Sequence, residues 1–253
     1  MSALQGKVAL VTGAGQGVGQ GIALALATEG VSVAVVGRTE AKLETTCELL
    51  RERGVQARPY ALDVLKTESI APLVDRVATD MGRLDILVNN AYSGNLGKLL
   101  DLDLKSFTKG YVSGPFAAFE FMKAAHPHLV ASGGGSIVNL VTSAMVRWDL
   151  STYGAYASAK SALRSLSRTA AVEWAQDGIR VNSVAPHALS PGLKWWTENN
   201  PEEAEEFVAA IPMKYIGDPE TDIGRAVVAL CGPDMRYLTG ATVPLDGGQA
   251  HFG

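Results

Sequence analysis

Short apolar runs rich in β-branched residues alternate along the chain with longer segments whose apolar positions recur at helical spacing. Most of the runs are apolar almost throughout, which is typical of strands covered by helices on both faces. They occupy residues 7–13, 31–37, 57–64, 84–90, 135–143, 179–186 and 241–247. Helical spacing is clear at Ile22, Leu24 and Leu26, and again at Leu163, Leu166, Ala170 and Val172. The alternation predicts an α/β fold, a doubly wound parallel sheet of about seven strands with helices on both faces.

The length and composition fit one domain of this kind. The chain has 253 residues without a Pro/Gly/Ser-rich linker or an internal repeat, so residues 1–253 are predicted to form a single domain. Hydrophobic residues make up 47% and charged residues 19%, which argues against disorder. The formal net charge of −4 offers no basic surface to a phosphate backbone, so we expect no nucleic-acid partner.

Metal-binding motifs and targeting segments are not found in the sequence. Cys47 and Cys231 form no CxxC pair, which fits a reducing compartment. The four histidines belong to no HExxH motif or Cys/His cluster, so no metal site is predicted. The N-terminus has no signal-peptide pattern, and no run of 18 apolar residues occurs. We therefore expect a cytoplasmic protein with no membrane partner.

A glycine-rich segment, TGAGQGVGQG, follows the first predicted strand and precedes a predicted helix. The common GxGxxG pattern is absent, and the spacing is Gly13-x-x-x-Gly17-x-Gly19. Residues without a Cβ permit a sharp turn and let the backbone approach a pyrophosphate, which the N–H groups of the helix N-terminus favour. We therefore expect Gly13, Gln16, Gly17, Val18 and Gly19 to bind a dinucleotide; the alternative is a flexible glycine loop.

The residue after the second predicted strand bears on the choice of dinucleotide. An acidic residue there would bind the 2′-hydroxyl of NAD, whereas an arginine can pair with the 2′-phosphate of NADP. Arg38 occupies this position and favours NADP(H), with NAD(H) as the second option. Glu40 lies close and weakens the prediction, and Arg38 as a solvated surface charge is the alternative.

Tyr156 and Lys160 are four residues apart in a predicted helix and therefore share one of its faces. A phenol titrates near ~10, and a neighbouring ammonium stabilises the phenolate, so the pair could exchange a proton with a carbonyl or alcohol oxygen. Ser143 ends the fifth predicted strand, where its hydroxyl could hold the substrate oxygen. A serine there is commonly only a cap or turn former. The glycine turn, Ser143, Tyr156 and Lys160 together favour a catalytic role.

These motifs occur in the order typical of one family, and nearly the whole chain resembles the short-chain dehydrogenases/reductases, in their single-domain branch of about 250 residues. The segments that carry the resemblance are TGAGQGVG (12–19), Asp63-Val64, NNA (89–91), Ser143 with Tyr156 and Lys160, IRVNSVAP (179–186) and TGATVPLDGG (239–248). The resemblance implies a Rossmann-like fold and hydride transfer between a nicotinamide cofactor and a substrate carbon, with Tyr156 as general acid/base.

The resemblance also assigns cofactor contacts to residues that the pattern alone does not reveal. It implies that Asp63, with Val64 beside it, contacts the adenine, and that Asn90 and Ala91 line the cofactor cleft. Pro186 would lie by the nicotinamide ring. Lys160 would bond the nicotinamide ribose, and Tyr156 would also lie at the cofactor.

The sequence departs from the family pattern at three places. The family usually has NNAG, but Tyr92 follows Ala91 here and would narrow the cleft. Aligning GPF (114–116) places Tyr111 where the family has an asparagine that supports a water relay to the catalytic lysine, so Tyr111 is a candidate replacement. The family's Pro-Gly becomes Pro186-His187, and Pro191 stands where a threonine is frequent. His187 would lie near the substrate, or would be a loop histidine without a chemical role.

The segment 187–215 is where this family has its substrate lid. Trp195 and Trp196, followed by an acidic helix and Phe207, suggest an amphipathic flap that covers an apolar substrate; packing on the protein itself or at a subunit contact is the alternative. Further apolar walls are predicted from Tyr92, Met145, Trp148 and Tyr153. We expect a hydrophobic ketone or secondary alcohol as the small-molecule substrate. The acidic residues argue mildly against a strongly anionic one.

Small residues along 161–174 would allow close helix approach, and the family usually forms a homo-oligomer, a tetramer or dimer, with this helix and the one before it. A place for the same helix face in the internal core is the alternative. Two further hypotheses stay open beside the oxidoreductase. One is a catalytically weak dinucleotide-binding sensor or scaffold, which Tyr111 and His187 favour. The other is elimination or isomerisation without net redox, against which the intact cofactor turn and reactive set argue.

Overall fold

A single seven-stranded parallel sheet forms the centre of the protein in a computed structural model that describes residues 2–147, 152–250 and 252. The strand order is β3-β2-β1-β4-β5-β6-β7, which confirms the predicted doubly wound α/β fold. The strands are β1 (Val8–Thr12), β2 (Ser32–Gly37), β3 (Ala57–Ala61), β4 (Ile86–Asn89), β5 (Gly135–Leu140), β6 (Ile179–Pro186) and β7 (Thr242–Leu245).

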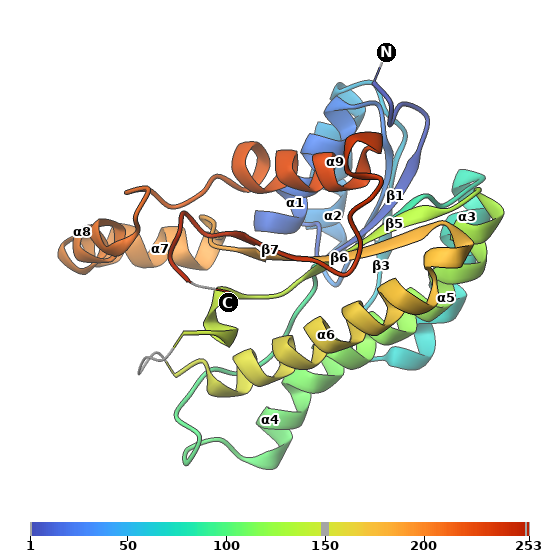
Figure 1. Ribbon diagram of the computed structural model, residues 1–253. Coiled ribbons are helices and arrows are strands. Elements are labelled where there is room, and N and C mark those ends of the chain that lie inside the picture. The colour runs from blue at the N-terminus through green and yellow to red at the C-terminus, as the bar shows by residue number, and fades with distance from the viewer. Residues whose placement is uncertain (1, 148–151, 251, 253) are drawn as a thin grey trace.

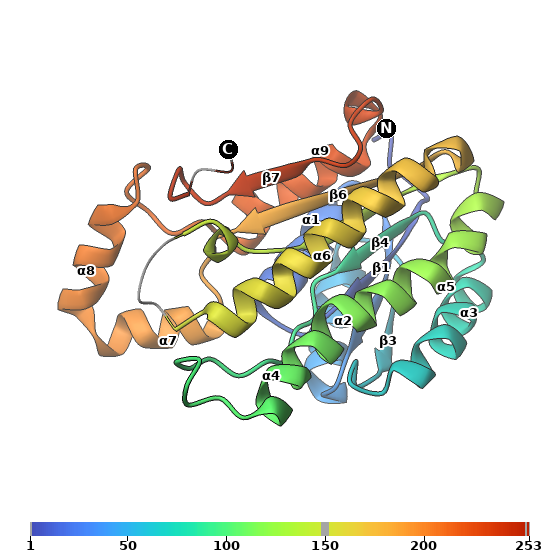
Figure 2. The same ribbon diagram turned by 60° about the horizontal axis from the view of Figure 1, so that its bottom comes forward.

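Helices cover both faces of this sheet (Figures 1 and 2). One face carries α1 (Gly17–Thr28), α2 (Glu40–Glu52) and α9 (Arg225–Cys231). The other carries α3 (Ile70–Met81), α5 (Ala117–Ala131) and α6 (Gly154–Glu173). A short helix, α4 (Leu104–Tyr111), packs beside α6. Beyond the strand ends lie α7 (Pro191–Asn199) and α8 (Pro201–Ala210), which stand apart from the layers in Figure 2.

The first strand explains why the apolar runs do not alternate with polar residues. Val8 and Leu10 of β1 join the core beneath α3 and α5, whereas Ala9 and Val11 join the core beneath α1. Successive side chains of a strand point to opposite faces, so a strand between two helical layers needs apolar residues throughout. All five residues of β1 are accordingly buried.

The strand order reverses between β1 and β4, and this reversal locates the binding crevice. Strands β2 and β3 lie on one side of β1, and strands β4 to β7 lie on the other side. The helices that follow β1 and β4 therefore diverge, and a crevice opens at the carboxyl ends of these two strands.

The predicted strand limits are too long at two functionally important ends. Asp63 and Val64 lie in the loop after β3, which ends at Ala61. Ser143 begins a short 3₁₀ turn after β5 instead of ending the strand. At the far end of α6, Val172 is 81% exposed although its spacing predicted a core position, because Ala170 and Ala171 supply the buried surface there. No helix among the described residues is long and apolar enough to cross a bilayer.

Candidate active site

A pocket of about 410 Å³ occupies the crevice at the carboxyl ends of β1 and β4. Its walls come from the glycine turn after β1, the end of β2, the loop after β3, the loop after β4, and the start of α7. Of the residues predicted to bind a cofactor, it is lined by Gly13, Gln16, Gly17, Val18, Arg38, Val64, Asn90 and Ala91. The fold thus gathers five sequence segments around one site.

The glycine turn has the geometry that its spacing predicts. Gly13 and Gly17 have φ of +68° and +60°, a conformation that side chains rarely adopt. A Cβ on Gly19 would lie 2.5 Å from both the Asn90 amide nitrogen and the Gly13 carbonyl oxygen, so only glycine permits this approach. Helix α1 begins at Gly17, and the preceding Gln16 makes no capping bond to it. The free N–H groups of this first turn fit a pyrophosphate.

Asn90 supports this turn from β4. Its amide nitrogen donates to the carbonyl oxygens of Thr12 (2.9 Å) and Gly13 (3.2 Å). The Thr12 hydroxyl in turn accepts from the backbone N–H groups of Asn90 (2.9 Å) and Ala91 (3.0 Å). These bonds tie β1 to β4 at the base of the pocket. The role of Thr12 was missed in the sequence, where it reads as one more strand residue.

Two cations stand at the β2 end of the pocket. Arg38 is exposed and has no hydrogen bond or ion pair with any described residue. Lys42, which sequence reasoning missed, lies in the first turn of α2 and donates to Gln16 Oε1 at 2.5 Å. Glu40 makes no ion pair with Arg38 in the described part of the chain. Asp63 does not line the pocket, and its carboxylate accepts from the Leu65 N–H at 3.1 Å.

Tyr156 and Lys160 lie one turn apart near the start of α6, as predicted. The Lys160 ammonium lies 5.8 Å from the centre of the Tyr156 ring and donates to the Leu140 carbonyl oxygen of β5 at 2.6 Å. The Tyr156 hydroxyl shares a hydrogen bond with the side chain of Thr142, directly before Ser143. Helix α6 and the end of β5 therefore bring Tyr156, Lys160 and Ser143 into one neighbourhood.

The titration of this pair differs from the sequence-based prediction. Burial raises the pKa of Tyr156 to about 12, against the lowering effect of the Thr142 hydrogen bond. Burial lowers the pKa of Lys160 to about 7, because the buried helix face disfavours the ammonium. The prediction that Lys160 lowers the pKa of Tyr156 is therefore not met in this structure. Near neutral pH the phenol is protonated.

Ser143 has a buried carboxylate partner that the sequence pattern did not reveal. Its hydroxyl donates to Asp246 Oδ2 at 2.5 Å, across 103 residues of sequence. Asp246 follows β7 and also accepts from the backbone N–H groups of Gly248 and Ala250, at 3.1 Å each. The only sequence signal was the family-like segment TGATVPLDGG. Asp246 thus fixes the Ser143 hydroxyl from the side of β7.

Four further residues predicted near the reacting centre are Tyr111, Tyr153, Met145 and Pro186. Tyr111 ends α4; it stacks on Phe107 (5.3 Å between ring centres) and contacts Phe116 edge to face (6.2 Å). The ring of Tyr153 packs on the ring of Tyr156, with 6.0 Å between ring centres. Met145 packs on a small core that contains Val141, Leu163 and Ala185, and Pro186 ends β6 paired with Leu245.

The segment 187–215, where the substrate lid is predicted, contains two helices, α7 and α8. The two tryptophans separate: Trp196 packs on Phe207 of α8 (5.7 Å between ring centres), and Trp195 is 64% exposed. The ring of His187 also contacts the ring of Phe207, with 5.2 Å between ring centres. Burial lowers the pKa of His187, and its Nδ1 is buried without a partner among the described residues. Trp148 lies outside the described residues.

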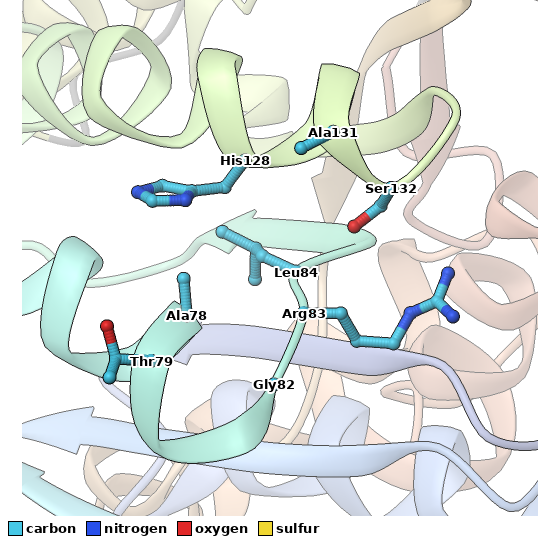
Figure 3. A pocket seen from close by; sticks show the side chains of 8 residues that line it. All are labelled: Ala78, Thr79, Gly82, Arg83, Leu84, His128, Ala131 and Ser132. Carbon is cyan, nitrogen blue, oxygen red and sulfur yellow. The ribbon is translucent and has the colours of Figure 1, made fainter.

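A second hollow of about 430 Å³ lies at the opposite, amino edge of the sheet, between the ends of α3 and α5 (Figure 3). Two of its polar side chains, His128 and Arg83, are engaged with carboxylates. His128 contacts Asp75 at 2.7 Å, and Arg83 forms a bidentate pair with Asp85 at 2.6 and 2.7 Å. The imidazole and the guanidinium of this hollow are therefore both engaged, whereas Tyr156, Lys160 and Ser143 lie at the other edge of the sheet. No metal-binding cluster occurs among the residues that the structure describes.

Comparisons with known proteins agree with this fold. The family model described as enoyl-(acyl carrier protein) reductase matches residues 13–250. A 12alpha-hydroxysteroid dehydrogenase of a Clostridium species is 38% identical over 98% of both chains. A solved 7 alpha-hydroxysteroid dehydrogenase, complexed with NADH and 7-oxo glycochenodeoxycholic acid, is 30% identical with a TM-score of 0.91, over 98% of this chain and 95% of that one. The L-sorbose reductase of Gluconobacter frateurii, complexed with NADPH and L-sorbose, is 29% identical with a TM-score of 0.89, over 98% of each chain.

The chain belongs to the short-chain dehydrogenase/reductase family. It is an oxidoreductase that acts on CH–OH or C=O groups of a small molecule with a nicotinamide cofactor.

Proposed function

We propose that this protein is an NADP(H)-dependent oxidoreductase that interconverts a hydrophobic ketone and its secondary alcohol, with a hydroxysteroid as the preferred substrate class. The observation that carries the proposal is the convergence of Tyr156, Lys160 and Ser143 at the carboxyl edge of the sheet, beside a glycine-lined pocket. The bound nicotinamide supplies or accepts the hydride.

Tyr156 is the proposed general acid/base. With its pKa raised to about 12, the phenol holds its proton at neutral pH and can give it to a carbonyl oxygen during reduction. Alcohol oxidation requires the phenolate and should accelerate as the pH rises. Ser143, held by Asp246, would orient the substrate oxygen, and Lys160 would hold the cofactor ribose and favour the phenolate when charged.

An apolar substrate is supported by the lid and by the relatives. Trp196, Phe207 and His187 form a cluster of aromatic rings in edge-to-face contact between α7, α8 and the end of β6. Two relatives are named for hydroxysteroid oxidation, and a steroid is a rigid apolar ligand that such rings accommodate. The acidic first turn of α8 (Glu202 and Glu203) argues against a strongly anionic acyl carrier as substrate.

The proposal is tested by assaying hydroxysteroids, oxosteroids and small aliphatic ketones with both cofactors, following the absorbance of the reduced nicotinamide. We expect turnover of at least one steroid pair at lower concentration than any small ketone. If NADPH binds but none of the ketones or alcohols turns over, the catalytically weak sensor or scaffold is the better interpretation.

NADP(H) is preferred in this proposal because Arg38 and Lys42 place two cations at the β2 end of the pocket. A 2′-phosphate carries about two negative charges and forms charge-assisted hydrogen bonds with such groups. The solved relatives include one complex with NADH and one with NADPH, so the choice depends on these residues of the present chain.

Arg38→Asp is expected to reverse the cofactor preference. The change removes a cation that faces the 2′-phosphate and adds a carboxylate that repels it, so the affinity for NADPH relative to NADH should fall at least tenfold, or about 1.4 kcal/mol. Fluorescence titration of both reduced cofactors measures the ratio. Arg236→Asp, an equal charge change on the exposed 3₁₀ turn before β7, is the matched control. An unchanged ratio in Arg38→Asp would show that Arg38 does not select the cofactor.

A homo-oligomer built on α5 and α6 belongs to the same proposal. Phe116, Phe119 and Val172 are 52%, 44% and 81% exposed on or directly before these helices. Apolar residues that are exposed to this extent favour a helix face that a second subunit covers. Size-exclusion chromatography with light scattering tests it, and a monomer at micromolar concentration would contradict it.

A further inference from the structure

The loop after β4 places an aromatic ring directly against the reactive pair. The ring of Tyr92 lies 5.1 Å from the Lys160 ammonium and 4.9 Å from the ring of Tyr156, edge to face. Lys160 is 2% exposed and makes no ion pair with any described residue. Its only hydrogen bond in the described part of the chain is to the Leu140 carbonyl oxygen. After that carbonyl oxygen, the Tyr92 ring at 5.1 Å is a further group that can compensate the buried positive charge, and it lies nearer than the Tyr156 ring at 5.8 Å.

The surrounding backbone is shaped to admit this ring. A Cβ on Gly110 would lie 2.6 Å from the Tyr92 hydroxyl oxygen, and a Cβ on Gly94 would clash with the same atom. Gly114, inside the wide π-helical turn between α4 and α5, lies along the ring edge, where a Cβ would be 3.5 Å away. Gly94 and Gly110 thus leave room for a phenol that the loop after β4 inserts beside α6, whereas the position of Gly114 would tolerate a Cβ in ordinary contact.

The hydroxyl of Tyr92 contributes less than its ring. The Oη atom is buried without a hydrogen-bond partner among the described residues. An unpaired buried hydroxyl costs free energy, so its placement must be compensated by the contacts of the ring. Those contacts are with Lys160 and Tyr156, the two groups of the reactive pair.

We propose that Tyr92 is a positioning residue whose aromatic face stabilises the Lys160 ammonium by a cation–π interaction and holds it beside Tyr156. The catalytic consequence rests on the proposed function, because Lys160 favours the phenolate only while it is charged. The interaction itself does not depend on that function. The titratable groups around Lys160 are the phenols of Tyr92 and Tyr156, with Tyr111 behind Tyr92 and Tyr153 behind Tyr156. The nearby carboxylate of Asp246 is engaged with Ser143.

A double-mutant cycle on folding stability tests the interaction without any turnover assay. Tyr92→Leu is made in the wild-type chain and in Lys160→Met, and the unfolding equilibrium constants are measured by denaturant titration at pH 6 and pH 9. At pH 6 the coupling should change the unfolding constant about 2- to 30-fold, which is the range of cation–π interactions. At pH 9 most of Lys160 is neutral, and the coupling should largely disappear.

Three further variants keep the test decisive. Tyr92→Phe should retain the coupling, and 3,4,5-trifluorophenylalanine at position 92, of similar shape but weaker ring quadrupole, should reduce it even if Tyr92→Leu fails to fold. Tyr153→Leu removes a ring that packs on Tyr156 but not on Lys160, and should show no coupling to Lys160→Met at either pH. The proposal would be overturned if the coupling between positions 92 and 160 were absent at pH 6, were equally large at pH 9, or were unchanged by fluorination of the ring.

The catalytic consequence has its own readout. In Tyr92→Leu, the limb of the pH–rate profile governed by Lys160 should move to lower pH by roughly 0.4–1.5 units, the shift that loss of a cation–π interaction produces. Tyr92→Phe should keep the wild-type limb. A purely structural role for Tyr92 would lower the rate without moving this limb. A chain that shows the stability coupling but turns over no substrate would refute the proposed function and leave the interaction standing.

Discussion

Replacing Tyr156 with phenylalanine is expected to lower kcat for ketone reduction about 10²–10⁴-fold, the usual contribution of general acid/base catalysis. The phenylalanine ring can keep the edge contact with Tyr92 but has no proton to deliver. The glycine turn, Arg38 and Lys42 are untouched, so NADPH should bind with nearly unchanged affinity. Steady-state kinetics and fluorescence titration of NADPH, measured on the same preparation, separate the two effects.

The matched control for this change is Tyr237→Phe. Tyr237 is fully exposed and lies near the amino edge of β7, far from the crevice. Removing its hydroxyl should leave both turnover and NADPH binding as they are. Turnover by Tyr156→Phe at the wild-type rate would refute the role proposed for the phenol, and the protein would then need another proton donor.

Lys160→Met is expected to alter the pH dependence of stability more than any other single change at the site. The folded chain releases the Lys160 proton near pH 7, whereas the unfolded chain holds it until about 10.5. Between these values the unfolded state binds more protons, so wild-type stability rises with pH. The penalty for the buried ammonium is present in full below pH 7 and is relieved above it. Methionine has no such penalty, so it should stabilise the chain most at low pH.

Chemical denaturation of both proteins from pH 6 to pH 9 measures this effect. The stability of the wild type relative to Lys160→Met should improve by roughly 2–3 kcal/mol across the range. Loss of the bond to the Leu140 carbonyl adds an offset that does not vary with pH. A difference that stays constant from pH 6 to pH 9 would show that Lys160 titrates normally, despite its burial.

The fold was predictable because strands that are covered on both faces are apolar almost throughout. β1 is buried at every residue and β2 at its four central residues, so their sequences contain no polar alternation. Strand ends were harder to place, because the same apolar residues continue into loops that are also buried. Val64 is an example: it is 6% exposed, yet it follows β3 in a loop.

The site was predictable where its parts are close in sequence. One helical turn joins Tyr156 to Lys160, and the glycine spacing defines the turn before α1. Contacts between distant segments left no such signal. The bond from Ser143 to Asp246 and the contact of Tyr92 with Lys160 depend on strand order and loop shape, which no local pattern encodes.

The pKa shifts of Tyr156 and Lys160 also could not be predicted from local sequence. Sequence spacing indicated that the Lys160 charge would lower the pKa of Tyr156. Burial has the larger effect in the structure, since it raises the pKa of Tyr156 and lowers that of Lys160. The depth of a side chain is a property of the whole fold and cannot be read from a spacing of four residues.

Hydride transfer at this site is tested most directly with NADPH that carries deuterium at C4 of the nicotinamide. Each of its two C4 diastereomers is incubated with a ketone whose reduction has been detected in the assay, and the mass of the alcohol product is measured by mass spectrometry. The proposed chemistry predicts one deuterium on the new carbinol carbon from one diastereomer only, and almost none of this product with Tyr156→Phe. An alcohol product without deuterium from either diastereomer would contradict it.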